Sequence, residues 1–202
     1  MKKYPSIALL EVASVASGIK TVDKMVKSAP ISVLKAGTVH NGKYLIMVGG
    51  SVASVEEAYS VGMDICSEYL IDSIILPDIH HQLHQAILGE QYNIEEDTVG
   101  IVETRTEAAL IGGLDKALKG AAVELISVKL ADDLGGNAYG ILCGTIDEVE
   151  AALDIFVENV SHPGNIINRE IVPRFHEEVS KHIQSSSLFN KKSPMELDGG
   201  EI

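Results

Sequence analysis

Apolar runs separated by polar turns divide the start of this 202-residue chain into short predicted strands. Residues 6–12 (SIALLEV) and 71–76 (IDSIIL) are apolar runs of strand length. Between them, residues 33–50 hold two further apolar runs, one on each side of the dipeptide Asn41-Gly42. Asn-Gly favours a tight hairpin, because both residues tolerate the positive φ that a type I′ turn requires. We therefore expect four strands here, two of them joined as a hairpin.

Apolar positions with helical spacing lie between these strands. Ser14 is suited to cap a helix that runs to about residue 28, and Ile19, Val22 and Val26 recur along one face of that helix. A first helix is therefore predicted between the first strand and the hairpin.

A second helix is predicted from Ser54, as its N-cap, to about Tyr69. Glu56 and Glu57 suit the positive end of its dipole. Residues 77–88 predict a short terminal helix after the last strand. The element order is therefore β-α-β-β-α-β.

The same pattern occurs a second time in the chain. Residues 6–34 align with residues 98–126 at an offset of 92, and small changes of offset fall in predicted loops. The aligned pairs include Glu11/Glu103, Asp23/Asp115, Lys27/Lys119, Gly42/Gly136 and His80/His176. The fold class predicted is α/β (α+β), with two tandem ferredoxin-like domains. We place them at residues 1–94 and 95–184, and expect residues 185–202 to be a disordered tail.

Composition narrows the functional classes. The net charge of −13 argues against nucleic-acid and anionic-membrane partners. No apolar run reaches the roughly 20 residues of a membrane span, and the N-terminal sequence lacks the layout of a signal peptide. Cys66 and Cys143 stand alone in apolar segments, which indicates buried thiols in a reducing cytoplasm.

Four segments of the repeat carry a family resemblance. They are VGIVETRTEAALIGGLDKALKGAAVELISVKL and GTIDEVEAALD in the second copy, and ALLEVASVASGIKTVDKMVKSAPISVLKAG and GGSVASVEEAY in the first. Together they resemble the bacterial microcompartment shell proteins in their tandem-domain, trimeric form, most closely the propanediol-utilisation group. The resemblance covers about residues 6–183, and both copies begin with the strand that opens the standard domain, so the chain looks unpermuted.

This resemblance implies a structural protein without enzymatic activity, located in a microcompartment shell in the cytoplasm. Three chains would form a homotrimeric, pseudohexameric tile that meets other shell proteins edge to edge around a central pore. A closed ring forms when each subunit makes the same heterologous contact with the next one. Because each chain holds two domains, three chains supply the six domains of such a ring. The implied pore-lining residues are Val39, His40, Asn41, Gly42, Asp132, Asp133, Leu134 and Gly135.

The resemblance also places Lys27, Lys119 and Arg174 at the tile edge, although the first copy has Asp78 where the second has Arg174. A simpler interpretation of each lysine is an i,i+4 pair with the preceding Asp on a solvated helix face. Retention in two diverged copies favours the edge role.

His40 stands where the propanediol-utilisation members have a cysteine that holds an iron–sulfur cluster at the axis. Thiolates are absent from this turn, so no such cluster is expected. Three His40 imidazoles on a threefold axis could bind Zn²⁺ or a similar ion. Alternatively, His40 lines a water-filled pore.

Other polar residues fit less specific roles. Asp132 and Asp133 suit a solvated turn, and in a trimer their six carboxylates would attract cations. His80 and His84 have the spacing of a zinc-protease helix, but residue 81 is His where that motif needs Glu. We interpret these histidines as structural or edge residues.

Two other functional classes remain open on sequence. Duplicated ferredoxin-like domains can bind small regulators, so a ligand-binding regulatory protein is the main alternative. A metal-dependent enzyme that uses His40 is the third. Sheet assembly, ligand-dependent oligomerisation and His40-dependent turnover would distinguish them.

Overall fold

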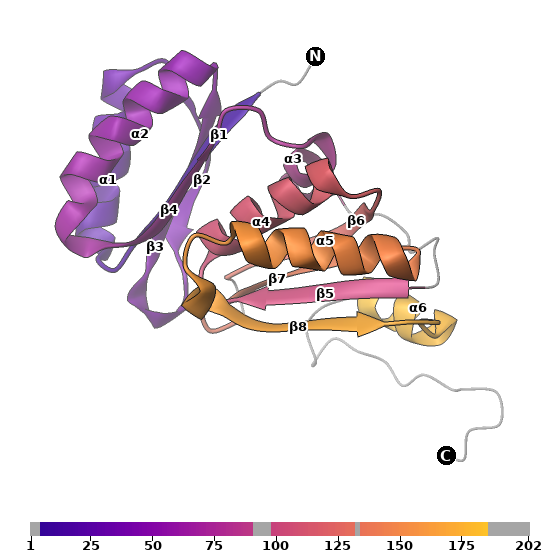
Figure 1. Ribbon diagram of the computed structural model, residues 1–202. Coiled ribbons are helices and arrows are strands. Elements are labelled where there is room, and N and C mark those ends of the chain that lie inside the picture. Colours follow the sequence, from indigo (N-terminus) through magenta and orange to yellow (C-terminus); the bar gives the residue numbers. More distant parts are fainter. Residues whose placement is uncertain (1–4, 91–97, 132–133, 186–202) are drawn as a thin grey trace.

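The computed structural model of the protein describes residues 5–90, 98–131 and 134–185. It contains two similar units, seen in purple and in pink to orange in Figure 1. The first consists of β1 (Ser6–Val12), α1 (Val15–Ser28), β2 (Ser32–Thr38), β3 (Tyr44–Gly50), α2 (Val52–Cys66), β4 (Leu70–Leu76) and α3 (His81–Ile87). The second consists of β5 (Thr98–Thr104), α4 (Glu107–Gly120), β6 (Glu124–Leu130), β7 (Ala138–Gly144), α5 (Ile146–Asn159), β8 (Ile166–Val172) and α6 (Glu177–Ser185).

Both units have the same topology. The strand orders are β2-β3-β1-β4 and β6-β7-β5-β8, and all the pairings are antiparallel. Each order places the first strand of its unit in the centre of a four-stranded sheet, between the third and fourth. The predicted pair of ferredoxin-like domains is confirmed.

The first sheet is covered on both faces. Ala8 and Leu10 of β1 pack with residues of α1 and α2 in one apolar cluster, whereas Ile7 and Leu9 join the core of the second unit. Successive strand residues point to opposite faces, so all seven residues of β1 are buried. Burial on both faces is why residues 6–12 form an almost uninterrupted apolar run.

The second sheet is covered differently on its two faces. Helices α4 and α5 pack on one face, where Val102 and Leu142 meet Phe156 (Figure 1). On the other face, Val99 and Cys143 form a smaller apolar cluster with Ile183 of α6. Among the described residues, α6 covers this face, whereas the second unit covers the matching face of the first sheet.

Local signals predicted the elements correctly and several of their ends inexactly: α2 ends at Cys66 and not at about Tyr69, and α3 begins at His81 and not at residue 77. Ser14 caps α1 and accepts a hydrogen bond from the backbone N–H of Ser17 at 3.2 Å. The cap of α2, however, is Ser51 and not Ser54: the Ser51 hydroxyl accepts the N–H of Ser54. Because β3 ends at Gly50, Ser51 is the first residue that can hold the extended cap conformation, and the helix begins one turn earlier than predicted.

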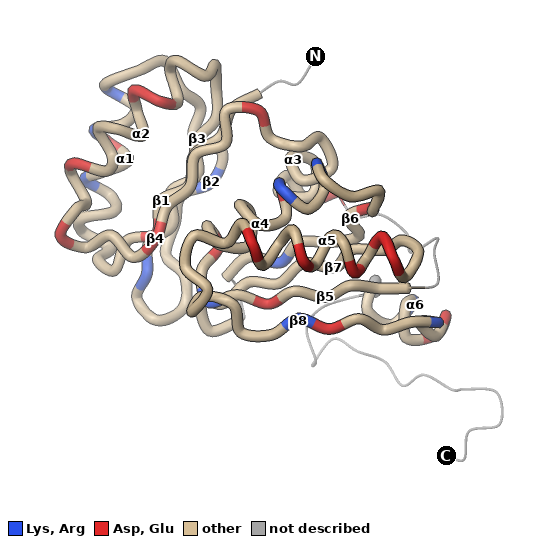
Figure 2. Tube along the Cα trace, viewed as in Figure 1, with Lys and Arg blue, Asp and Glu red and all other residues tan. Residues whose placement is uncertain are grey.

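The excess negative charge lies mainly on exposed helix surfaces. Figure 2 shows acidic residues along α2 and α5; their exposed carboxylates include Glu56 and Glu57 on α2 and Asp147, Glu150 and Asp154 on α5. In the part of the chain that the structure describes, no helix combines the length and apolar character needed to cross a membrane.

Candidate functional site

The β2–β3 turn has the backbone conformation that Asn41-Gly42 predicted. Asn41 has φ 64° and Gly42 has φ 73°, both in the left-handed region that glycine and asparagine tolerate best. His40 precedes them and is exposed. The hairpin therefore presents its imidazole at the surface of one chain.

The turns of the two repeats lie side by side. The Asn41 side-chain amide donates a hydrogen bond to the carbonyl of Gly135 at 2.7 Å, and Lys43 Nζ donates to the carbonyl of Gly136 at 3.0 Å. The predicted pore residues 39–42 and 134–135 are thus brought to one place. Asp132 and Asp133 lie outside the described residues.

A buried carboxylate, Glu11, ties the two units together, and sequence reasoning did not select it. Its side chain is fully buried, and one oxygen accepts the backbone N–H of Ala108 at 2.8 Å, in the first turn of α4. The other lies 3.5 Å from Lys43 Nζ. The positive helix terminus and the ammonium both favour a carboxylate here. The sequence signal that could have identified Glu11 is its position as a charged residue inside the otherwise apolar strand 6–12.

Glu107, the first residue of α4, is buried beside Glu11. Its side chain shares a hydrogen bond with that of Glu11, which requires that one of the two carboxyl groups carries a proton. Burial, reinforced by the neighbouring Glu11, raises the pKa of Glu107 to about 9. Glu107 is therefore a neutral carboxylic acid at neutral pH.

Asp72 of β4 is a second inter-unit anchor that the sequence did not reveal. It accepts hydrogen bonds from the Thr106 hydroxyl at 2.6 Å and from the Asn165 amide at 3.0 Å, both in the second unit. Thr106 is the N-cap of α4, so this contact fixes the start of the helix against the first sheet.

The predicted edge lysines both form the simple pairs. Lys27 lies 2.6 Å from Asp23 and Lys119 lies 2.6 Å from Asp115, each at i,i+4 spacing. Lys119 also donates to the carbonyl of Asp78 in the first unit. Lys119 therefore lies at the junction of the two units.

His80 and Arg174, two further positions singled out from the sequence, have defined local structure. Asp115 is buried and accepts the backbone N–H of His80 at 2.8 Å, which supports a structural position for that histidine. Arg174 is exposed and has φ 51°, an unusual value outside glycine. The edge role of the lysines and of Arg174 stays a prediction.

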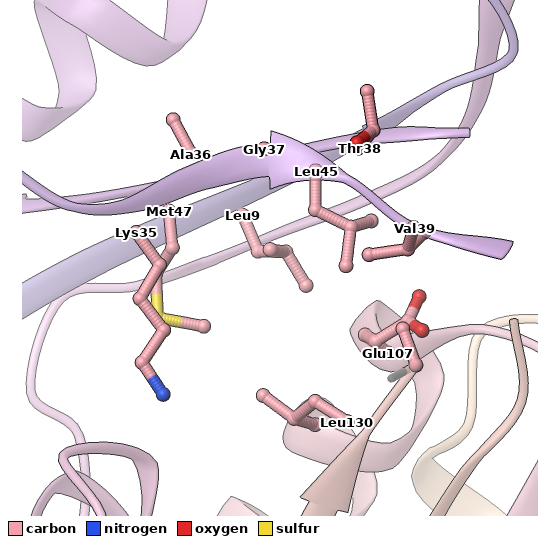
Figure 3. A pocket seen from close by; sticks show the side chains of 11 residues that line it. Leu9, Lys35, Ala36, Gly37, Thr38, Val39, Leu45, Met47, Glu107 and Leu130 are labelled. Atoms are coloured by element: carbon pink, nitrogen blue, oxygen red, sulfur yellow. The ribbon is translucent and has the colours of Figure 1, made fainter. Parts of the chain in front are cut away.

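A cavity of about 210 Å³ lies between the second unit and the face of the first sheet opposite α1 and α2. In Figure 3, Leu9, Leu45 and Met47 point from the strands toward Glu107 and Leu130. Lys35 lies along one side of the cavity. The lining is mainly apolar, with a cationic and a carboxyl side chain.

The apolar face predicted for α1 is only partly covered within this chain. Ile19 is 54% exposed and Val26 is 43% exposed, and the buried residues of α1 are Gly18, Thr21 and Met25. The predicted apolar spacing is present, and Val22 on the same face packs against the core of the first unit. Gly18, Thr21 and Met25 are the residues that α1 buries against α2 and its own sheet.

The described residues contain no cluster of metal-ligating side chains. Across residues 5–90, 98–131 and 134–185, no three His, Cys, Asp or Glu side chains are grouped to hold an ion. His80 and His81 have ring centroids 4.5 Å apart, and His84 is buried. Cys66 and Cys143 are buried thiols, as predicted.

Sequence comparisons match most of the chain to microcompartment shell proteins. A sequence model of the BMC domain matches residues 6–79 and again residues 98–175. The bacterial microcompartment shell protein PduT of Citrobacter freundii is 36% identical over 172 residues, which cover 85% of this chain and 94% of that protein. The shell protein EutM of Escherichia coli is 28% identical over 85 residues, 42% of this chain and 86% of EutM.

Solved structures show the same architecture. The crystal structure of a microcompartment protein from Desulfitobacterium hafniense matches with a TM-score of 0.77 and 31% identity, covering 87% of this chain and 98% of that one. A fused permuted hexameric shell protein matches in fold, with a TM-score of 0.56 and 19% identity over 78% of this chain and 82% of that one.

Proposed function

This chain belongs to the family of bacterial microcompartment shell proteins, and on that premise we propose that three copies form a ring of six BMC domains that serves as one tile of the shell. Its role is structural. The tile lies in the cytoplasm, packs edge to edge with other shell proteins, carries no catalytic activity of its own and surrounds a pore for small molecules.

One observation supports the proposed trimer. The chain exposes apolar residues whose counterparts in the other repeat are buried between its two units. Ile19, Val26, Val33 and Val179 are each between 38% and 54% exposed. Their counterparts Ile111, Leu118, Leu125 and Leu83 are each at most 5% exposed. A second copy that repeats the intrachain packing would cover all four residues.

The polar contacts between the units supply a template for the contact between chains. Within the chain, Glu11 accepts the N–H of Ala108, Asp115 accepts that of His80, and Gln82 accepts that of Leu125. The counterparts of the acceptors are Glu103, Asp23 and Glu178, which face the same kind of partner on another copy. Repetition of one heterologous contact closes a ring, and six domains require three chains.

The mass of the assembly tests this proposal. Native mass spectrometry of untagged protein is expected to give three times the 21.6 kDa of one chain. A stable monomer or a particle of six chains would contradict the proposed ring.

At the tile edge, we expect the double variant Lys27→Ala, Lys119→Ala to form fewer or smaller sheets while it remains a folded trimer. The Lys27–Asp23 pair is exposed and contributes about 0–1 kcal/mol to one chain, whereas Lys119 pairs with the buried Asp115, so the mass and the circular dichroism of the variant are measured to confirm a folded trimer. The loss of the lysines is repeated at every edge of a lattice. Negative-stain microscopy and sedimentation measure the sheets. The control is Lys24→Ala, Lys116→Ala, an equal charge change at another matched pair on the same helices; sheets lost equally in both would contradict a specific edge role.

At the pore, we infer that the exposed His40 residues of three chains face one another around the axis. Untagged protein is then expected to carry substoichiometric Zn²⁺ or Ni²⁺, because neutral imidazoles ligate these ions, and His40→Ala should abolish the binding. Elemental analysis of the parent protein and of the His40→Ala variant measures the bound metal. Equal metal in the two proteins removes His40 as the ligand, and a brown protein with iron and sulfide would contradict the expectation that no cluster forms.

A further inference from the structure

Helix α4 of the second unit packs against strand β4 of the first unit through a close apolar contact. Gly112 of α4 faces Ile74 of β4, and a Cβ atom at Gly112 would lie 3.3 Å from Cδ1 of Ile74, tighter than ordinary van der Waals contact. Ile74 is half-buried and packs against the core that the two units share. This junction therefore combines the smallest residue with an apolar side chain.

The other repeat has charged residues at both of these positions. Gly112 is the sixth residue of α4, and Lys20 is the sixth residue of α1, which has the same length. Ile74 is the fifth residue of β4, and Glu170 is the fifth residue of β8. In the two sheets, Ile74 and Glu170 lie opposite the same position of the central strand. Two positions that touch within the chain have thus changed together, to residues of opposite charge.

Neither charge serves the junction between the two units of one chain. Lys20 and Glu170 are both exposed. Asp23, the next acidic residue along α1, pairs with Lys27. Glu170 accepts a hydrogen bond from the Asn168 amide on its own strand at 3.1 Å. A carboxylate has two oxygens and accepts several hydrogen bonds, so this contact leaves Glu170 able to bind an ammonium group.

We propose that Lys20 of one chain forms an ion pair with Glu170 of the next chain in the ring, and that this pair determines which domains meet. The inference rests on the proposed ring, in which α1 of one copy packs on β8 of another as α4 packs on β4 within the chain. The two residues then occupy the places that Gly112 and Ile74 occupy at the junction within the chain. Opposite charges attract there, and partial removal from water strengthens the attraction.

The same pair disfavours contacts between like domains of different chains. A first domain on a first domain would set Lys20 against Ile74, and a second domain on a second domain would set Glu170 against Gly112. Each of these contacts removes one charge from water without an opposite charge beside it, which is unfavourable. Complementary groups at both correct junctions thus favour alternation of first and second domains around the ring.

Charge reversal tests the ion pair in the full-length protein. Lys20→Glu and Glu170→Lys should each raise the concentration at which the trimer dissociates by about tenfold or more, because like charges then face each other at every contact between chains. The double variant Lys20→Glu, Glu170→Lys restores opposite charges and should recover most of the loss. Sedimentation velocity over a dilution series, at low salt and a fixed sub-denaturing urea concentration, measures dissociation. Circular dichroism confirms the fold.

Lys24→Glu is the matched control on the same helix. Its repeat counterpart Lys116 is exposed at the junction within the chain, so this variant should dissociate as the parent protein does. The mass of the parent tests the ring separately. With a trimeric parent, single reversals that dissociate like the control, or a double variant no tighter than the single ones, would overturn the ion pair and leave the ring in place. A monomeric parent would overturn both.

Discussion

Replacing Ile19 with Asp is expected to convert the proposed trimer into folded monomers. Ile19 is 54% exposed in the single chain, whereas Ile111, its repeat counterpart, is fully buried against the first unit. If α1 packs on another copy as α4 packs within the chain, the Asp places an unpaired charge in an apolar contact, which costs several kcal/mol. The association constant should fall by about a thousandfold or more.

Stability of the single chain should change little, because surface substitutions usually lie within about 0.5 kcal/mol. Light scattering after size-exclusion chromatography measures the mass, and circular dichroism confirms the fold. Ile146→Asp is the matched control: Ile146 is 45% exposed at the start of α5 and lies outside the proposed contact. A trimeric Ile19→Asp protein would contradict the proposed interface, as would equal dissociation of both variants.

Replacing Glu107 with Gln is expected to make the protein more stable above neutral pH and to remove much of a pH dependence. The folded-state pKa of Glu107 is raised to about 9, whereas an unfolded chain has a value of about 4.3. The folded state thus holds a proton that the unfolded state releases. Below the unfolded pKa this group costs nothing; as the pH rises from there toward 9, stability falls.

The gain from Glu107→Gln should be on the order of 4 kcal/mol larger at pH 8 than at pH 5. Urea unfolding at both values measures it. The side chains that act on Glu107 are Glu11 of β1 and Lys43, which remain in place. Glu124→Gln, at an exposed carboxylate of β6, is the control and should show no such difference. A Glu107→Gln protein with unchanged pH dependence would show that Glu107 ionises normally.

The amino-acid sequence determined the repeat, the element order and the type of fold. These depend on local signals: the alternation of apolar runs, a cap at Ser14 and a turn at Asn41-Gly42 whose φ values are both positive. Such signals act within a few residues, so they can be recognised from the sequence without knowing which surfaces pack together. The misplaced cap of α2 shows the limit, because Ser51 and Ser54 are both good caps and only the end of β3 selects between them.

Tertiary structure alone decided which apolar faces are covered and which polar groups meet. Ile19 and Ile111 have the same helical spacing, yet one is exposed and the other buried, because α4 faces the sheet of the other unit as well as its own sheet. Likewise Glu11 and Glu107 are 96 positions apart in sequence, and their contact follows from docking one unit on the other. Burial and pKa are properties of the surroundings of a group, and those surroundings come from distant parts of the chain.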